Sequence, residues 1–337
     1  MRPMALCRTA DGWSLVDGLD EALRLRHDPD TLVWIESDVT GLPEAEMRKL
    51  GQEFQIDPLA IEDALSPRQR PKLEAYPGHL LLVVHQLDED EDDQLLPRQL
   101  AAFIGRGFVV LLHHGADRVV GEARRRVESA GDEVTSSDRL LHAVVDTAVD
   151  DDESIATRIA QEVEVMEDEA LTVARAGDRR DGRSSRRGRW PSQYRLYTLK
   201  QQITTLRRYA LPIASALERR PTYEGQERDD TLDRLFRDVH DHVVRLGAEV
   251  RSSDDLTDGV LELVRSFQAD ELNETNRKLT AWAAIIAGPA LIVGLYGTNY
   301  GLLPPRSVGQ WGFALVLLLM ATTSGLLFGF FRRRGWL

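Results

Sequence analysis

Hydrophobic residues are distributed differently in the last sixty residues of the chain than in the rest. Between residues 279 and 331 the only charged residue is Arg306, and the stretch on each side of it is long and apolar. About 20 apolar residues in a helix cross the roughly 30 Å core of a bilayer. This pattern predicts two membrane-spanning helices, at residues 279–299 and 311–331, joined by a loop at residues 300–310. A buried helical hairpin in a soluble protein is the alternative.

The charges that flank the two spans predict their orientation. Arg277 and Lys278 precede the first span, and three arginines begin a basic tail at residues 332–337. Because cytoplasmic loops of membrane proteins carry an excess of Lys and Arg, we expect both chain ends in the cytoplasm. The first span is rich in Ala and Gly, which let helices approach closely, so we expect it to be the inner helix and the second span to face lipid.

A helical periodicity precedes the first span. Apolar residues three and four positions apart recur through residues 226–278 and predict one long helix, roughly 80 Å at 1.5 Å per residue. An isolated monomer needs no such rod, whereas an oligomeric stalk does. A coiled-coil dimer is the alternative, although the pattern lapses at residues 252–255. The apolar positions are Leu232, Leu235, Val239, Val243, Leu246, Val250, Val260, Val264 and Phe267.

The N-terminal part mixes strand and helix patterns, and the predicted fold class is α+β. We expect a cytoplasmic α/β domain at residues 1–135, with a hairpin turn at residues 105–107. A helical hairpin follows at residues 136–225, and its arginine-rich tip, at residues 175–189, favours a solvated loop over a grip for lipid or RNA. Strands are expected at residues 32–35, 80–87, 100–104 and 108–113, and helices at residues 44–54, 58–65, 142–174 and 194–217.

Composition adds a partition of charge. With 42 basic and 55 acidic residues the formal net charge is −13, which disfavours a general nucleic-acid binder. Five basic residues and no acidic ones follow residue 277, so the first 277 residues carry −18 and the last 60 carry +5. The single cysteine, Cys7, excludes an internal disulfide framework. The N-terminus shows no basic segment followed by an apolar one, so we expect no cleaved signal peptide.

Several acidic and histidine residues carry side chains that can bind metal ions. The run at residues 88–93 and the five acidic residues between 146 and 153 are each most simply a solvated surface. The pairs His113 with His114 and His240 with His242 lack a spacing typical of a transition-metal site, so we expect structural roles for them.

Tyr296-Gly297-Thr298-Asn299 closes the first predicted span. Glycines on both sides of an amide at this place favour either of two structures. One is a backbone bend that turns carbonyl oxygens and the Asn299 side-chain oxygen toward an axis. The other is an ordinary helix C-cap, with Gly297 or Asn299 in the left-handed conformation.

Five short motifs, in order along most of the chain, resemble the CorA family of divalent-cation channels. Their combination is specific, and it implies a homopentameric funnel with an N-terminal cytoplasmic domain, a long helical stalk and two C-terminal transmembrane helices. The motifs are residues 64–74 (ALSPRQRPKLE), 236–242 (FRDVHDH), 276–280 (NRKLT), 296–299 (YGTN) and 333–337 (RRGWL).

The resemblance departs from the family pattern at two places. Thr298 stands where the family usually has methionine, and the loop at residues 300–310 lacks the acidic residues usual in magnesium-selective relatives. Another residue at the position of Thr298 also occurs in the ZntB-like branch, which is associated with zinc. A ZntB-like zinc transporter therefore stays open as an alternative.

The resemblance implies a channel of the plasma (inner) membrane for Mg²⁺, with Co²⁺ or Ni²⁺ tolerated. Since Mg²⁺ keeps several waters when bound, Asn299 and the Gly297 carbonyl would accept hydrogen bonds from the hydrated ion and still release it. Leu279 would form an apolar constriction. The pore residues expected by register from the filter are Asn273, Asn276, Leu279, Ala287, Ala290, Gly294, Tyr296 and Thr298.

The resemblance also implies regulatory divalent ions between subunits. Asp238 matches one such carboxylate, with Asp90 or its neighbour Asp88 as the opposite partner. Because five acidic cytoplasmic parts repel one another, bridging ions would favour the closed bundle. The expected partners are further copies of the chain, the bilayer and divalent cations. A membrane-anchored sensor or enzyme is the alternative of another class, but the sequence offers no P-loop, nucleophile elbow or zinc-protease motif.

Overall fold

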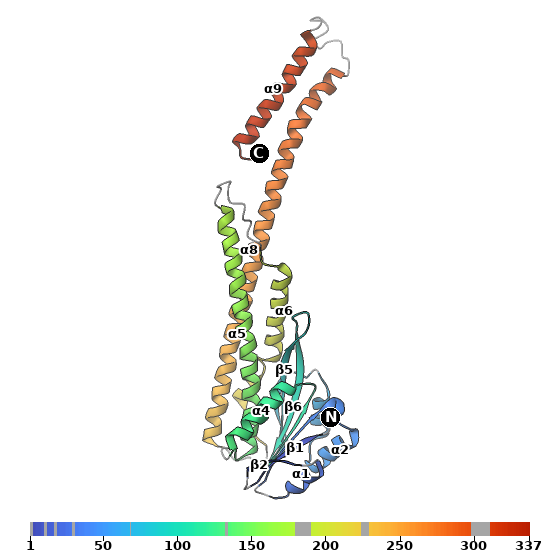
Figure 1. Cartoon of the computed structure of the whole chain (residues 1–337), viewed down its shortest axis with the longest axis vertical. Coiled ribbons are helices and arrows are strands. Elements are labelled where there is room, and N and C mark those ends of the chain that lie inside the picture. Colours follow the sequence, from blue (N-terminus) through green and yellow to red (C-terminus); the bar gives the residue numbers. More distant parts are fainter. Residues whose placement is uncertain are drawn as a thin grey trace. The chain divides into compact units, whose positions relative to one another are not determined.

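The computed structural model describes residues 3–9, 12–16, 19–28, 31–67, 69–131, 134–178, 190–223, 229–297 and 311–337. The chain divides into two compact units, Met1–Leu261 and Glu262–Leu337 (Figure 1).

A seven-stranded sheet forms the centre of the first unit. Its order is β2-β1-β3-β7-β6-β5-β4, and only the β3–β7 pair is parallel. The long central strands are apolar and buried almost throughout, as expected of a sheet that is covered on both faces. The strands are β1 (Met4–Thr9), β2 (Gly12–Val16), β3 (Leu32–Asp38), β4 (Lys72–Tyr76), β5 (His79–Glu89), β6 (Leu95–Gly105) and β7 (Phe108–His113).

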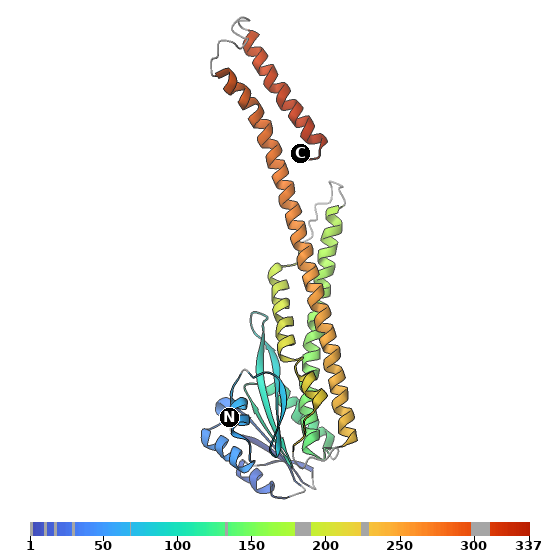
Figure 2. The same ribbon diagram turned by 180° about the vertical axis from the view of Figure 1, so that it is seen from behind.

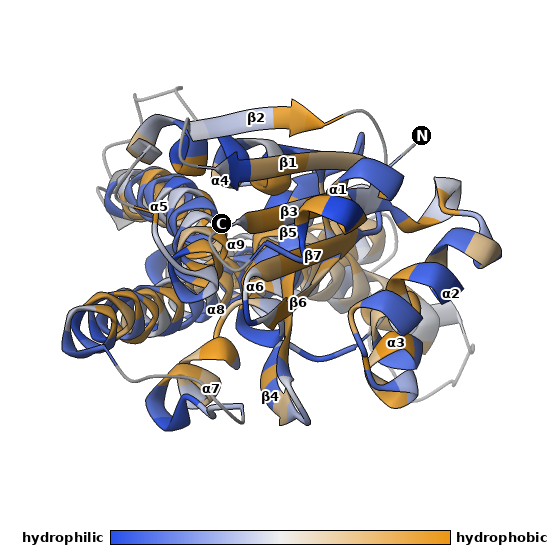
Figure 3. Cartoon of the chain, turned by 90° about the horizontal axis from the view of Figure 1, so that it is seen from below, coloured by the Kyte–Doolittle hydropathy of each residue, from blue (hydrophilic) through white to orange (hydrophobic). Residues whose placement is uncertain are grey.

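Helices pack on both faces of this sheet, as Figure 3 shows in a view from below. One face is covered by α1 (Leu19–Leu25), α2 (Glu44–Glu53) and α3 (Pro58–Leu65). The short 3-10 turn η1 (Val39–Gly41) follows β3 and precedes α2. The other face and its hydrophobic core involve α4 (Asp117–Ala130), α5 (Ser137–Asp178), α7 (Ile213–Arg219) and the start of α8 (Asp230–Gly297), while α6 (Gln193–Tyr209) lies beside β5 and β6 (Figure 2).

All four predicted strands are present, and the structure extends three of them. The turn at residues 105–107 is confirmed, because Gly105 pairs with Phe108 and Gly107 takes a positive φ of 78°. The helix predicted at residues 194–217 is interrupted at residues 210–212. It ends at Tyr209, and Pro212 precedes a separate helix, α7, because proline cannot continue the backbone hydrogen-bond ladder.

The predicted long helix is present as the 68-residue helix α8, which continues without a break through Pro289 to Gly297. In the second unit its last part lies beside α9 (Trp311–Arg333), as both views show (Figures 1 and 2). Both helices are long and apolar enough to cross a membrane, and only 6% and 0% of their most apolar windows are buried within the chain. Apolar helices with so little burial argue against the hairpin core of a soluble protein.

Candidate ion path and metal-binding sites

One face of the membrane-spanning part of α8 is turned toward α9. Its less exposed residues recur three or four positions apart, at Ala281, Ile285, Gly288 and Ile292. A side chain added at Gly288 would place its Cβ 3.1 Å from Leu327 Cδ1 and 3.4 Å from Thr323 Cγ2, so the two helices touch here. Glycine at this position permits that close approach.

Four of the expected pore residues lie on the opposite face of α8, whereas Tyr296, four positions after Ile292, lies on the face turned toward α9. At about 100° per residue, Leu279, Ala287, Ala290 and Gly294 are roughly 135–165° from the middle of the stripe that faces α9. All four are exposed in the single chain, and Leu279 is 63% exposed. Asn273 and Asn276 are exposed as well, whereas Tyr296 is only partly so. An exposed helix face that α9 leaves open is available to other copies of the chain or to a pore.

Of the expected filter residues, the structure describes Gly297 but not Thr298 or Asn299. Gly297 is the last residue of α8 and is exposed. Thr298 and Asn299 lie outside the described residues, as does the loop at residues 300–310.

Asp88 and Asp90, the two candidates for a regulatory partner, differ in what they already bind. Asp88 accepts a hydrogen bond from Gln86 at 2.7 Å and lies 3.5 Å from both Arg98 and Arg118. Its charge is therefore neutralised within one chain. Within the described residues, the Asp90 side chain accepts hydrogen bonds only from the backbone N–H groups of Asp92 (2.9 Å) and Gln94 (2.8 Å), which shape the β5–β6 turn.

Asp238 is open to solvent on helix α8, with 74% of its side chain exposed. Asp238 Oδ2 lies 3.8 Å from Nε2 of His242, which is charged only when it is protonated. Of the expected regulatory carboxylates, Asp238 and Asp90 keep most of their charge available for a metal ion, and Asp88 does not.

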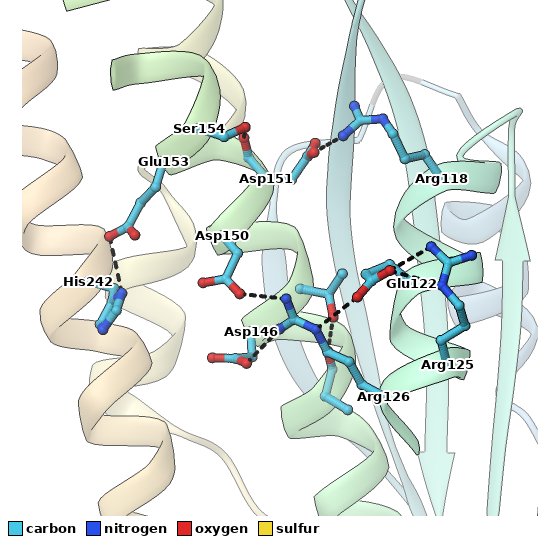
Figure 4. Close-up of polar contacts among 12 residues, drawn as sticks. Arg118, Glu122, Arg125, Arg126, Asp146, Asp150, Asp151, Glu153, Ser154 and His242 are labelled. Atoms are coloured by element: carbon cyan, nitrogen blue, oxygen red, sulfur yellow. Dashed lines mark hydrogen bonds and ion pairs between the residues drawn. The ribbon is translucent and has the colours of Figure 1, made fainter. Parts of the chain in front are cut away.

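The acidic residues of α5 face the arginines of α4 rather than solvent alone (Figure 4). Arg126 pairs with Asp146 at 3.0 Å and Asp150 at 2.7 Å, and Arg118 pairs with Asp151. Asp152 is 5% exposed, and burial raises its pKa well above the ordinary value, although Arg118 opposes this. The expectation of a solvated acidic face was therefore wrong for these residues, because helix α4, which supplies the arginines, was not predicted.

Two groups of side chains within the described part of the chain could each hold a metal ion, and the sequence suggested neither. Asp150, Glu153 and His242 form one, in which His242 Nδ1 lies 3.1 Å from Glu153 Oε1 (Figure 4). The other consists of Asp38, His113 and Asp117. Both were missed because each joins elements that are far apart in sequence.

The N-terminal motif at residues 64–74 is fixed by a buried amide. Gln99, on β6 and fully buried, donates from Nε2 to the carbonyls of Asp63 (3.3 Å) and Ala64 (3.2 Å). Its Oε1 accepts from the Gln69 N–H at 3.0 Å. Lys72 then pairs with Asp63 at 2.7 Å. These contacts give the motif a structural role at the end of α3.

Comparison with known proteins gives a consistent family. The family model described as "CorA-like Mg2+ transporter protein" matches residues 29–333. The chain is 25% identical to the cobalt/magnesium transport protein CorA of Thermotoga maritima over 92% of this chain and 85% of that protein. It is also 25% identical to the putative metal ion transporter YfjQ of Bacillus subtilis, over 91% of each chain.

Solved structures share the fold over the whole length. The complete CorA magnesium transporter of Methanocaldococcus jannaschii superposes with a TM-score of 0.77 at 17% identity, covering 100% of this chain and 99% of that one. The full-length CmaX protein gives a TM-score of 0.74 at 20% identity, covering 98% of both chains. The arrangement of an α/β unit, a long helix and two apolar C-terminal helices is thus common to all three.

The family model covers most of the chain, the sequence relatives align over nearly all of it, and the fold matches from end to end. The chain therefore belongs to the family of CorA-like Mg²⁺ transporter proteins, which move ions across membranes and are not enzymes.

Proposed function

We propose that this protein is a divalent-cation channel that carries Mg²⁺, and also Co²⁺, into the cell as a homopentamer in the plasma membrane. The chain would cross the membrane twice, with both ends in the cytoplasm. The observation that carries the proposal is the open face of α8, where Leu279, Ala287, Ala290 and Gly294 lie opposite the helix face that meets α9.

The open face suits a pore because α9 and the lipid can occupy the remaining surface. Five copies of α8 around an axis would line a path with small or apolar residues, and Leu279 would narrow it at the cytoplasmic end. An apolar constriction of this kind gates by excluding water.

The proposed filter is a ring formed by Asn299 and the Gly297 carbonyl. A hydrated Mg²⁺ ion presents water hydrogens, and neutral oxygens accept them without the tight binding of a carboxylate ring. Thr298 would add a hydroxyl beside this ring, where the family usually has methionine.

Intracellular metal would regulate the channel by binding between Asp238 of one subunit and Asp90 of the next. Support comes from the exposure of Asp238 and from the absence of an ion pair on Asp90 among its described contacts. Metal bound there offsets the repulsion between acidic subunits and favours the closed state, so falling intracellular Mg²⁺ opens the channel.

Flux into liposomes tests the choice of ion. Purified protein is reconstituted, and uptake of Mg²⁺, Co²⁺ and Zn²⁺ is compared with and without an imposed pH gradient. We expect Mg²⁺ and Co²⁺ uptake that follows the membrane potential and is unaffected by the proton gradient. Zinc uptake without magnesium uptake, or uptake that requires the proton gradient, would replace the proposal by a ZntB-like zinc transporter.

A further inference from the structure

Three side chains with metal-binding chemistry meet at one edge of the central sheet. Asp38 ends β3 and His113 ends β7, and the two residues are partners in the last position of the β3–β7 ladder. Asp117 is the first residue of α4, which follows β7. Since β3 and β7 form the parallel pair of this sheet, the residues lie at the carboxyl ends of parallel strands. In α/β sheets ligands commonly bind at this edge.

His113 is buried and directed at the two carboxylates. Its side chain is 6% exposed, and its Nδ1 has no hydrogen-bond partner among the described residues. Nδ1 lies 3.8 Å from Asp38 Oδ2 and 3.6 Å from Asp117 Oδ1. These separations exceed the 2.7–3.2 Å of an N–H···O hydrogen bond. The imidazole nitrogen is therefore a buried polar atom whose surroundings leave it unsatisfied.

The same separations are close to those between two ligands of one metal ion. With metal–ligand bonds of about 2.1 Å, neighbouring ligand atoms lie roughly 3.0–3.4 Å apart. A shift of a few tenths of an ångström closes the difference. Asp117 can supply it, because its side chain is 76% exposed and stands at the end of a helix.

Asp38 is held in place by hydrogen bonds from its neighbours, as metal-binding carboxylates generally are. Its Oδ1 accepts from the Thr40 N–H at 2.7 Å and from the Thr40 hydroxyl. Its Oδ2 accepts from the Gly115 N–H at 3.1 Å. Gly115 has a φ of +76°, a conformation that glycine adopts without strain. Glycine at this position therefore allows the backbone to direct its N–H toward Asp38.

The surroundings of Asp38 and His113 lower the pKa of both groups. Burial alone would raise the pKa of Asp38, but the hydrogen bonds from Thr40, the charge of His113 and the hydrogen bond from Gly115 together lower the pKa of this carboxyl. Burial lowers the pKa of His113, against the opposite influence of Asp117 and Asp38. A neutral imidazole is the form that binds metal ions.

We propose that Asp38, His113 and Asp117 together bind one divalent transition-metal ion within each chain. One imidazole and two carboxylates suit Co²⁺, Ni²⁺ or Zn²⁺, whereas Mg²⁺ prefers oxygen ligands and water. The site lies inside a single subunit and does not depend on the proposed channel function. A bound metal ion would connect the ends of β3 and β7 to the first residue of α4. The second residue of α4, Arg118, pairs with Asp151 on α5.

The second cluster, Asp150 with Glu153 and His242, is a weaker candidate. Asp150 already pairs with Arg126 at 2.7 Å, and the side chains of Glu153 and His242 are 33% and 31% exposed. A metal ion there would have to displace the guanidinium. This cluster therefore provides the matched control.

Cobalt titration of the purified full-length protein tests the proposal. Co²⁺ is the probe because its visible absorption reports the number and type of its ligands, and calorimetry gives the number of sites. We compare the wild type, Asp117→Asn and Glu153→Gln. We expect Asp117→Asn to weaken one Co²⁺ site per chain at least tenfold, and Glu153→Gln to leave that site unchanged. We also expect an equal concentration of Mg²⁺ to leave Co²⁺ bound.

Asp117→Asn decides the question because this exposed, isosteric change leaves the fold intact. A second variant, His113→Gln, is expected to abolish the nitrogen-ligated absorption band, with its folding checked by thermal unfolding. The proposal is overturned if Asp117→Asn binds as many Co²⁺ ions with the same affinity as the wild type. Displacement of the bound Co²⁺ by equimolar Mg²⁺ would overturn it as well.

Discussion

Asp152 is a buried carboxylic acid on α5 whose Oδ1 has no hydrogen-bond partner within the described residues. Because burial raises its pKa, the unfolded chain loses this proton at a lower pH than the folded chain does. Ionisation therefore favours the unfolded state increasingly as pH rises above about 4. We expect Asp152→Asn to unfold at a higher temperature than the wild type at pH 7.5, and the difference to shrink by pH 4.5.

Thermal unfolding at the two pH values measures this effect, and Asp255→Asn, at an exposed position on α8, is the control. An Asp152→Asn variant that is less stable than the wild type at pH 7.5 would show that the carboxylate has a partner that stabilises its charge.

His85 changes stability with pH in the direction opposite to Asp152, because its protonation favours the unfolded state as the pH falls. It is buried on β5 against the ring of Tyr209, with centroids 4.8 Å apart, and burial lowers its pKa to about 4. The unfolded chain therefore binds a proton from about pH 6.5 downward, and stability falls between pH 6.5 and 4. This single residue accounts for about 3 kcal/mol of that loss, at 1.36 kcal/mol per pKa unit. We expect His85→Phe to flatten the profile of unfolding free energy over this range; an unchanged slope would exclude a neutral, buried imidazole.

At the scale of elements, the contact between α8 and α9 depends on Gly288. The nearest atoms to an added Cβ are Leu327 Cδ1 at 3.1 Å and Thr323 Cγ2 at 3.4 Å, so a branched side chain would push the two helices apart. We expect Gly288→Val to lower the unfolding temperature in detergent by several degrees and to reduce transport. Gly325→Val on α9 is the control, because nothing lies within 4 Å of its added Cβ. Equal losses in the two variants would contradict the close contact.

The sequence predicted the elements whose pattern is strong and local. The apolar strand Phe108–His113 and the 68-residue α8 follow directly from runs and periodicity. Helix α4 was missed because its charged sequence has only four buried residues, and its partners for Arg118 and Arg126 come from α5. The Asp38–His113 pair could not be predicted, since it depends on the register of two parallel strands far apart in the chain.

At the scale of the whole molecule, the negative charge of the first 277 residues predicts that divalent ions affect how the subunits assemble. In the proposed homopentamer the first 277 residues of each chain carry −18 and repel those of the other copies, and divalent ions between Asp238 and Asp90 would offset this repulsion. We expect Mg²⁺ to slow proteolysis of the wild-type protein, and the double variant Asp238→Asn with Asp90→Asn to lose most of that protection. Asp88→Asn serves as the control because Asp88 is neutralised within its own chain by Arg98 and Arg118. Undiminished protection in the double variant would remove these residues from the regulatory site.

We propose that divalent ions pass through a ring of Asn299 side chains, which follow Gly297, the last residue of α8, by two positions in the sequence. The most direct measurement is Mg²⁺ uptake into liposomes by the purified Asn299→Ala variant. Thr322→Ala is the matched control, because within the described residues the Thr322 hydroxyl donates only to the Leu318 carbonyl of its own helix. We predict that Asn299→Ala loses at least nine-tenths of the wild-type uptake, while Thr322→Ala keeps it. Wild-type Mg²⁺ uptake by a correctly assembled Asn299→Ala protein would exclude the Asn299 ring from the ion path.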